Sequence, residues 1–223
     1  CFLLSLTSTA TCAQRHEVGI LAGGVNYIGE VGDTNYFNPK QFGYGIIYKR
    51  NITQRIALRA QLSTGSFSAN DKNATDLVRQ SRGLLFSNKY NALGIGIEVN
   101  YLDFPIGEFD TSWTPFLHLG VQGLTVDELY FPENEYKAVS HGKKLTLSVP
   151  FGAGIKLNLG QYFVIAAEVQ PQFTLTDNLD GSSPNTEKQP RSQQFSSSLS
   201  SDWLVFTGIS ITYAFGRLPC CRD

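Results

Sequence analysis

The stretch KKLTLSVPFGAGIKLNLG, residues 143–160, alternates between apolar and other side chains over most of its length. Large apolar residues and one alanine fill the odd positions from Leu145 to Leu159, and polar residues, glycine and one proline fill the even ones. Such alternation indicates a strand with a single apolar face. Strands of globular proteins are usually about 5–6 residues long, whereas about 9–11 residues cross the bilayer in a barrel strand. The length therefore favours a strand whose apolar face contacts lipid.

Seven other segments of the 223-residue chain repeat this alternation. Residues 162–175 follow the short link LGQ and form a hairpin with the first segment. Eight is an even number, as closure of an antiparallel barrel requires. We therefore predict an all-β fold, an eight-stranded antiparallel transmembrane β-barrel with a plugged lumen. The six remaining strands are expected at about 15–27, 41–50, 54–66, 89–102, 112–124 and 202–215.

The links between these strands are alternately long and short. The links after the second, fourth and sixth strands are short. Outer-membrane barrels have short periplasmic turns and long extracellular loops, so both chain termini are predicted in the periplasm. Residues 73–82 are expected to form a short helix within the second long link. The long links span roughly 28–40, 67–88, 125–142 and 176–201.

The composition and the first residues agree with export. The residues are 42% hydrophobic and 17% charged, and the net charge of −1 gives no electrostatic argument for nucleic-acid binding. We interpret residues 1–13, CFLLSLTSTATCA, as a signal-peptide remnant cleaved after Ala13. The barrel is assigned to residues 14–216 and a periplasmic C-terminal tail to residues 217–223. No run of 18 apolar residues occurs, so no spanning helix is expected, and we predict an integral protein of the Gram-negative outer membrane.

Aromatic residues concentrate near the ends of the predicted strands. Amphipathic rings suit the headgroup level of a bilayer, so we interpret these residues as membrane-interface girdles in contact with outer-membrane lipid. The alternative is a set of core aromatics in a soluble β-sandwich. The residues concerned are Tyr27, Tyr48, Tyr90, Tyr101, Trp113, Tyr162, Trp203, Tyr213 and Phe215.

Four charged residues occupy the alternate positions whose side chains are expected to point into the lumen: Arg59, Glu98, Lys156 and Glu168. The interior of an eight-stranded barrel is just filled by side chains, and buried charges require partners. We predict that these four residues form an ionic plug, with a proton or ion path as the alternative.

Special residues within the strands carry further expectations. Pro115 and Pro150 each remove a ladder hydrogen bond, so both are expected near a rim or at a bulge. Inward-facing glycines at positions 94, 96, 152 and 154 are expected to make room for larger side chains opposite them.

The sequence contains no recognisable catalytic constellation. His16, His118 and His141 are scattered, without the spacing of a catalytic triad or a metal site. His118 faces inward near Glu98 or Glu168 and could act as a base, but we favour a structural lumen histidine. No GxSxG, P-loop or HExxH motif is present. We therefore assign no catalytic, cofactor-binding or metal-ligating residue and expect a protein that is not an enzyme.

After maturation, Cys220 and Cys221 are the only cysteines left in the given sequence. Disulfides persist in the periplasm, but adjacent cysteines close only a strained ring. An intermolecular disulfide, free thiols and a vicinal bridge all remain open.

Several segments resemble the PorG-like outer-membrane barrels of Bacteroidota, which are associated with type IX secretion. They are HEVGILAGGVNYIGEVGDTNYFNP, FGYGIIYKRNITQRIALRAQLSTG and the ending YAFGRLPCC, and the YKRN turn and FGRLPCC tail are the most specific parts. The match covers most of the mature chain. The motif residues are Glu17, Gly19, Gly23, Tyr27, Gly29, Asp33, Asn38, Pro39, Tyr48, Arg50, Asn51, Arg55, Leu58 and Arg59.

The resemblance implies a non-enzymatic part of the type IX protein secretion machinery. Such a barrel anchors a periplasmic ring of the lipoprotein PorK and of PorN to the outer membrane, and a disulfide to PorK would use the C-terminal cysteines. We expect the short turns and the tail to bind this ring. A barrel enzyme acting on lipid or lipopolysaccharide and an adhesin-like barrel are the alternatives. The expected partner-binding residues are Arg50, Asn51, Arg55, Arg217, Cys220, Cys221 and Arg222.

Overall fold

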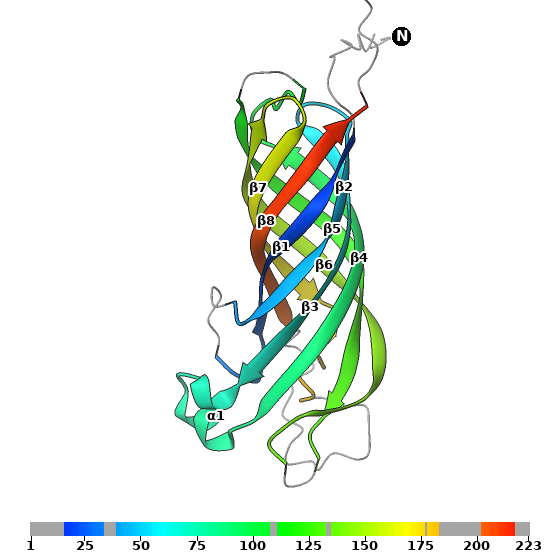
Figure 1. Cartoon of the computed structure of the whole chain (residues 1–223). Coiled ribbons are helices and arrows are strands. Elements are labelled where there is room, and N and C mark those ends of the chain that lie inside the picture. The colour runs from blue at the N-terminus through cyan, green and yellow to red at the C-terminus, as the bar shows by residue number, and fades with distance from the viewer. Residues whose placement is uncertain are drawn as a thin grey trace, which may run out of the picture.

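The computed structural model describes residues 16–33, 39–107, 111–132, 135–176, 178–182 and 202–216. Eight antiparallel strands follow one another around a closed barrel, and β8 pairs back onto β1 (Figure 1). The predicted fold is confirmed, and each predicted strand is present. The strands are β1 (His16–Ile28), β2 (Gln41–Asn51), β3 (Ile56–Asn70), β4 (Leu85–Asn100), β5 (Trp113–Tyr130), β6 (Val139–Leu159), β7 (Phe163–Thr174) and β8 (Trp203–Phe215).

The outer face of the barrel is an apolar band that runs across all eight strands. Side chains such as Ile95, Leu117 and Leu145 are 67%, 65% and 73% exposed. The residues directly before and after each of them in the strand point inward. A closed barrel pairs its backbone groups internally, which lets it cross a bilayer. An apolar surface of this extent requires lipid around it. The protein is therefore an integral outer-membrane barrel.

Strands β3 to β6 are longer than predicted, with 15, 16, 18 and 21 residues. They extend beyond the other strands at the end opposite the β8 terminus (Figure 1). There the pattern inverts, because outward residues such as Ser68 and Lys89 are polar while inward Phe67 and Phe86 are buried. This part of the barrel stands in water outside the membrane, so its apolar residues turn inward. The prediction ended these strands where the lipid-facing pattern stops.

An apolar cluster fills this extracellular part of the interior. Tyr27 packs edge-on against Phe86, with ring centroids 4.9 Å apart, and Phe67 lies 6.4 Å from Tyr90. The assignment of Tyr27 and Tyr90 to the interfacial girdles is wrong, since each is only 2% exposed. Both residues occupy inward-facing positions of their strands, so their rings lie in the lumen rather than against lipid.

The two strand prolines differ in their placement. Pro115 is the third residue of β5, close to the periplasmic rim as expected. Pro150 lies in the middle of β6, away from either rim. Regular pairing between β5 and β6 stops at Leu119↔Phe151 and resumes at Gln122↔Ser148 without a register shift. The expectation of a rim or a bulge is wrong for Pro150, which is accommodated by a local gap in the ladder.

Two short segments complete the ends of the barrel. Between β3 and β4, the 3₁₀ turn Asp71–Asn73 precedes helix α1 (Leu77–Arg82), which Asp76 caps by accepting a hydrogen bond from the Val78 backbone N–H. This helix falls within the predicted range of 73–82. At the periplasmic end, Phe104 and Ile106 are buried in a small cluster with β7 and β8. Among the described residues, no helix has the length and apolar character needed to cross a membrane.

Candidate functional site

A network of charged side chains occupies the periplasmic half of the lumen, and Glu98 on β4 is its centre. Its Oε1 accepts a hydrogen bond from Lys156 Nζ at 2.6 Å, and its Oε2 lies 2.7 Å from Lys49 Nζ. Arg59 Nη1 is 3.6 Å from the same Oε2. Glu98 and Lys156 are fully buried and Lys49 is 1% exposed. Strands β2, β3, β4 and β6 are thus linked through one carboxylate.

Arg59 extends the network to the opposite wall of the barrel. Its Nη1 and Nη2 donate to Glu168 Oε2 and Oε1 at 2.8 and 2.7 Å, a bidentate pair between β3 and β7. Nη2 also donates to Gln61 Oε1 at 2.7 Å. Bidentate guanidinium–carboxylate pairs are among the strongest ionic contacts in proteins. The structure thus brings together all four residues assigned to the ionic plug.

Two members of this network were missed in the sequence. Lys49 lies at one of the alternate positions of β2 whose side chains point inward, which is the same signal that identified the other four residues. Glu17 is fully buried on β1 and accepts hydrogen bonds from Asn51 Nδ2 at 2.8 Å and Thr212 Oγ1 at 2.6 Å. With these two, the network in the periplasmic half of the lumen holds three cationic and three anionic side chains. The charges balance, as burial of so many ionised groups requires.

Aromatic rings cover the periplasmic side of the network. Lys156 Nζ lies 4.9 Å from the Phe104 ring centroid and 5.6 Å from that of Phe116, and Lys49 Nζ lies 5.4 Å from Phe116. These distances are those of cation–π contacts. Because Phe104 belongs to the turn after β4, the periplasmic turn itself packs against the buried charges.

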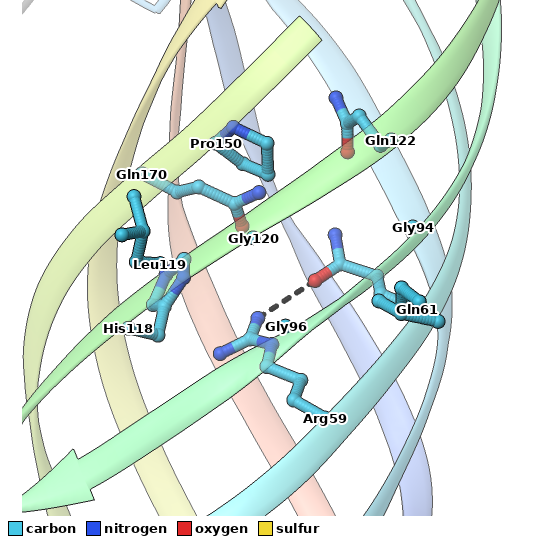
Figure 2. Close-up of a pocket in the computed structure, with 11 residues that line it drawn as sticks. Arg59, Gln61, Gly94, Gly96, His118, Leu119, Gly120, Gln122, Pro150 and Gln170 are labelled. Atoms are coloured by element: carbon cyan, nitrogen blue, oxygen red, sulfur yellow. Dashed lines mark hydrogen bonds between the residues drawn. The ribbon is translucent and has the colours of Figure 1, made fainter.

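A small cavity of about 20 Å³ lies on the other side of the network, between Arg59, Gln61, His118, Pro150 and Gln170 (Figure 2). His118 is 7% exposed, and neither its Nε2 nor Gln170 Oε1 has a hydrogen-bond partner. A space of this size holds about one water molecule.

Glycines make room for the larger rings in this region. A side chain at Gly152 would collide with the His118 ring, and one at Gly154 would meet Phe116 Cζ at 2.7 Å. These two inward glycines therefore accommodate neighbouring side chains, as expected from the sequence.

The predicted partner-binding residues lie at the periplasmic rim as far as the structure describes them. Arg50 is exposed, and Asn51 is tied to Glu17. Arg55 Nε donates to Asp103 Oδ1 at 2.6 Å, which joins the turn after β2 to the turn after β4. This exposed contact raises the pKa of the Arg55 guanidinium and lowers the pKa of the Asp103 carboxyl. The signal-peptide remnant at 1–13 and the tail residues Arg217, Cys220, Cys221 and Arg222 lie outside the described residues.

The interface aromatics occupy both ends of the apolar band. Trp203 begins β8 at the extracellular end and packs against Phe173, with ring centroids 5.3 Å apart. Apart from Tyr27 and Tyr90, the other assigned residues lie at the periplasmic ends of the strands or in the turns beside them, and all are exposed: Tyr48, Tyr101, Trp113, Tyr162, Tyr213 and Phe215.

This geometry defines a small outer-membrane β-barrel whose lumen is filled by a balanced ionic network. The chain belongs to the DUF6089 family, described as a domain of unknown function, whose family model matches residues 1–223. A search of curated proteins gives no match to the sequence.

Several solved structures are similar to this barrel. Neisserial surface protein A matches with a TM-score of 0.51 and 8% identity over 90% of this chain and 97% of its own, which supports the barrel fold alone. The N-terminal β-barrel domain of Pseudomonas aeruginosa OprF matches with a TM-score of 0.46 and 15% identity over 92% and 100% of the two chains. The attachment invasion locus protein Ail of Yersinia pestis matches with a TM-score of 0.45 and 10% identity over 91% and 99%.

Proposed function

We propose that this barrel is a non-enzymatic component of the type IX protein secretion machinery. In this role it anchors the periplasmic ring of PorK and PorN to the outer membrane through its short turns and its C-terminal tail. The resemblance of the first two hairpins and of the FGRLPCC ending to PorG-like barrels supplies the secretion role.

The observation that carries this proposal is the filled lumen. Glu98 forms ion pairs with two lysines, and Arg59 reaches across the barrel to Glu168. Phe104 packs against these charges from the periplasmic side. A barrel closed in this way acts through surfaces at its ends rather than by conducting solutes. An enzyme acting on lipid needs a catalytic group beside a cleft that the acyl chain can enter. His118, the residue considered as a base, is instead buried among lumen side chains.

The periplasmic rim offers a surface that fits an anchoring role. Arg50 is exposed at the end of β2 and Arg55 on the turn after it, and the Arg55–Asp103 pair holds the next short turn beside this one. Phe104 and Ile106 fasten that second turn to the barrel interior. A surface held in place before binding loses less conformational entropy when a partner binds.

The proposal is tested by reversing the two exposed charges in the full chain, with Arg50→Glu and Arg55→Glu combined. Cross-linked outer membranes are solubilised, the barrel is recovered, and PorK and PorN are quantified by mass spectrometry. We expect recovery of both to fall. Lys72→Glu, a reversal of one exposed charge on the extracellular side, is the control and should leave recovery unchanged.

Unchanged recovery of PorK and PorN with the double variant would contradict ring binding through this turn. The disulfide is tested separately by Cys220→Ser and Cys221→Ser on non-reducing gels. A PorK adduct that persists in the double serine variant would rule out a bridge through these cysteines.

A further inference from the structure

Three carboxyl groups from separate segments meet at the extracellular end of the barrel. Glu30 follows β1, Asp180 lies in the segment 178–182 after β7, and Asp202 directly precedes β8. One oxygen from each residue lies within 4.8 Å of the other two. Asp180 and Asp202 are fully buried. Within the described part of the chain, none of the ion pairs includes any of the three.

Neutral donors hold two of these carboxyl groups in position. Tyr27 Oη donates to Asp202 Oδ1 at 2.5 Å, and the Leu179 backbone N–H donates to Asp202 Oδ2 at 2.9 Å. The Ser182 backbone N–H donates to Asp180 Oδ1 at 2.8 Å. Such contacts orient the oxygens without neutralising their charge. Burial and the neighbouring carboxylates raise the pKa of both Asp180 and Asp202.

Two oxygens of this cluster are left unused. Asp180 Oδ2 belongs to a fully buried side chain and has no hydrogen-bond partner, and Glu30 Oε2 is likewise buried and unpaired. Buried polar atoms without a partner are rare in native proteins. An anionic oxygen at such a place needs a bound cation or a proton to offset the loss of hydration. A cation bound at this place would therefore satisfy the unused oxygens.

We propose that Glu30, Asp180 and Asp202 form a binding site for Ca²⁺. Calcium takes hard oxygen ligands at about 2.3–2.6 Å, so two of its ligands lie at most roughly 5 Å apart. The separations in the cluster fall within that span. Backbone carbonyls and water commonly complete the shell of this ion. Magnesium keeps several waters and is seldom enclosed by an all-protein cage, which disfavours it at a site this buried.

The position of the site gives the ion a structural consequence. Strands β1 and β8 form the closing seam of the barrel, and their pairing ends at Ile28↔Trp203. Glu30 and Asp202 lie just beyond that last pair, on the two sides of the seam. A bound Ca²⁺ joins the first long loop to the last one there. It would hold the seam closed in the part of the barrel that stands outside the lipid.

The experiment uses the full chain folded in detergent micelles and treated with a chelator. Calcium chloride is titrated in by calorimetry, and the thermal unfolding midpoint is measured with and without it. We expect binding of a single ion and a higher midpoint in its presence. Asp180→Asn should weaken binding about tenfold or more, since even changes in residues that only support the ligands weaken metal affinity by about 10–100-fold. Glu135→Gln, which removes an exposed charge on the same side of the membrane, should bind as the wild type does.

Asp180→Asn also relieves repulsion between buried carboxylates, so we expect it to fold without calcium. The shift in mobility between heated and unheated samples on gels verifies this. The proposal is overturned if the wild type shows neither heat nor stabilisation with Ca²⁺. Equal calcium affinity of Asp180→Asn and the wild type would overturn it as well. An equal response to magnesium chloride would overturn the assignment of calcium.

Discussion

Replacement of Glu98 by glutamine tests the ionic plug most directly. The wild-type carboxylate is fully buried and lies 2.6 Å from Lys156 Nζ and 2.7 Å from Lys49 Nζ. Glutamine has nearly the same shape, but it leaves both ammonium groups without a carboxylate in direct contact. Removal of one partner from a buried ion pair destabilises a protein by about 3–5 kcal/mol. We expect the free energy of unfolding to fall by about this amount.

The assay is urea unfolding of the barrel in detergent micelles, followed by tryptophan fluorescence and by mobility on unheated gels. Asp103→Asn is the matched control, because it also removes one carboxylate from an ion pair. That pair is exposed, with Arg55 at 58% and Asp103 at 60%. Solvent and salt screen such pairs, so the control should leave the urea midpoint unchanged.

The double variant Glu98→Gln/Lys156→Gln sharpens the test. It leaves two cations, Lys49 and Arg59, with two anions, Glu17 and Glu168, so the charges of this network are again balanced. Its loss of stability should be smaller than the sum of the two single losses by about 0.5–3 kcal/mol. Equal urea midpoints for Glu98→Gln and Asp103→Asn would refute the reasoning, as would strict additivity of the two lumen variants.

Three further outcomes follow from the structure. Gly152→Ala places Cβ 2.6 Å from the Val169 carbonyl oxygen and should lower stability by about 1–3 kcal/mol in urea unfolding, whereas Gly123→Ala, 3.8 Å from its nearest contact, should have little effect. Leu119→Arg puts a charge on the lipid face and should lower the yield of folded barrel in lipid vesicles, because an arginine at the bilayer midplane destabilises a barrel by about 2–4 kcal/mol. Leu77→Arg, on the exposed helix α1, should leave that yield unchanged. Wild-type protein in planar bilayers should show no stepwise current, and regular channel openings would contradict a filled lumen.

The lipid-facing strands were predicted well because their signal is local. Successive side chains of a strand point to opposite sides, so the alternation through Leu145 to Leu159 identifies both the strand and its lipid face. The same parity assigned Arg59, Glu98, Lys156 and Glu168 to the interior. The same reasoning should also have included Lys49, which lies at an inward-facing position of β2.

The prediction failed where the solvent outside the barrel changes. Beyond the membrane the apolar side turns inward, so Tyr27 and Tyr90 are core residues rather than interfacial ones. Alternation alone has the same period in both cases, and it does not tell which side faces water. Only the length of each strand relative to its neighbours in the closed barrel shows where the lipid ends.

The amino-acid pattern specified eight strands, their inward and outward faces and the alternation of long and short links, because each of these depends on neighbours along the chain. Pairing across the lumen depends on closure and stagger of the whole sheet. Arg59 meets Glu168, 109 positions away, and Glu30 meets Asp180 and Asp202 only because β8 returns to β1. The partners of the buried charges were therefore decided by the closed barrel, in which residues far apart in the chain share one small, water-poor interior.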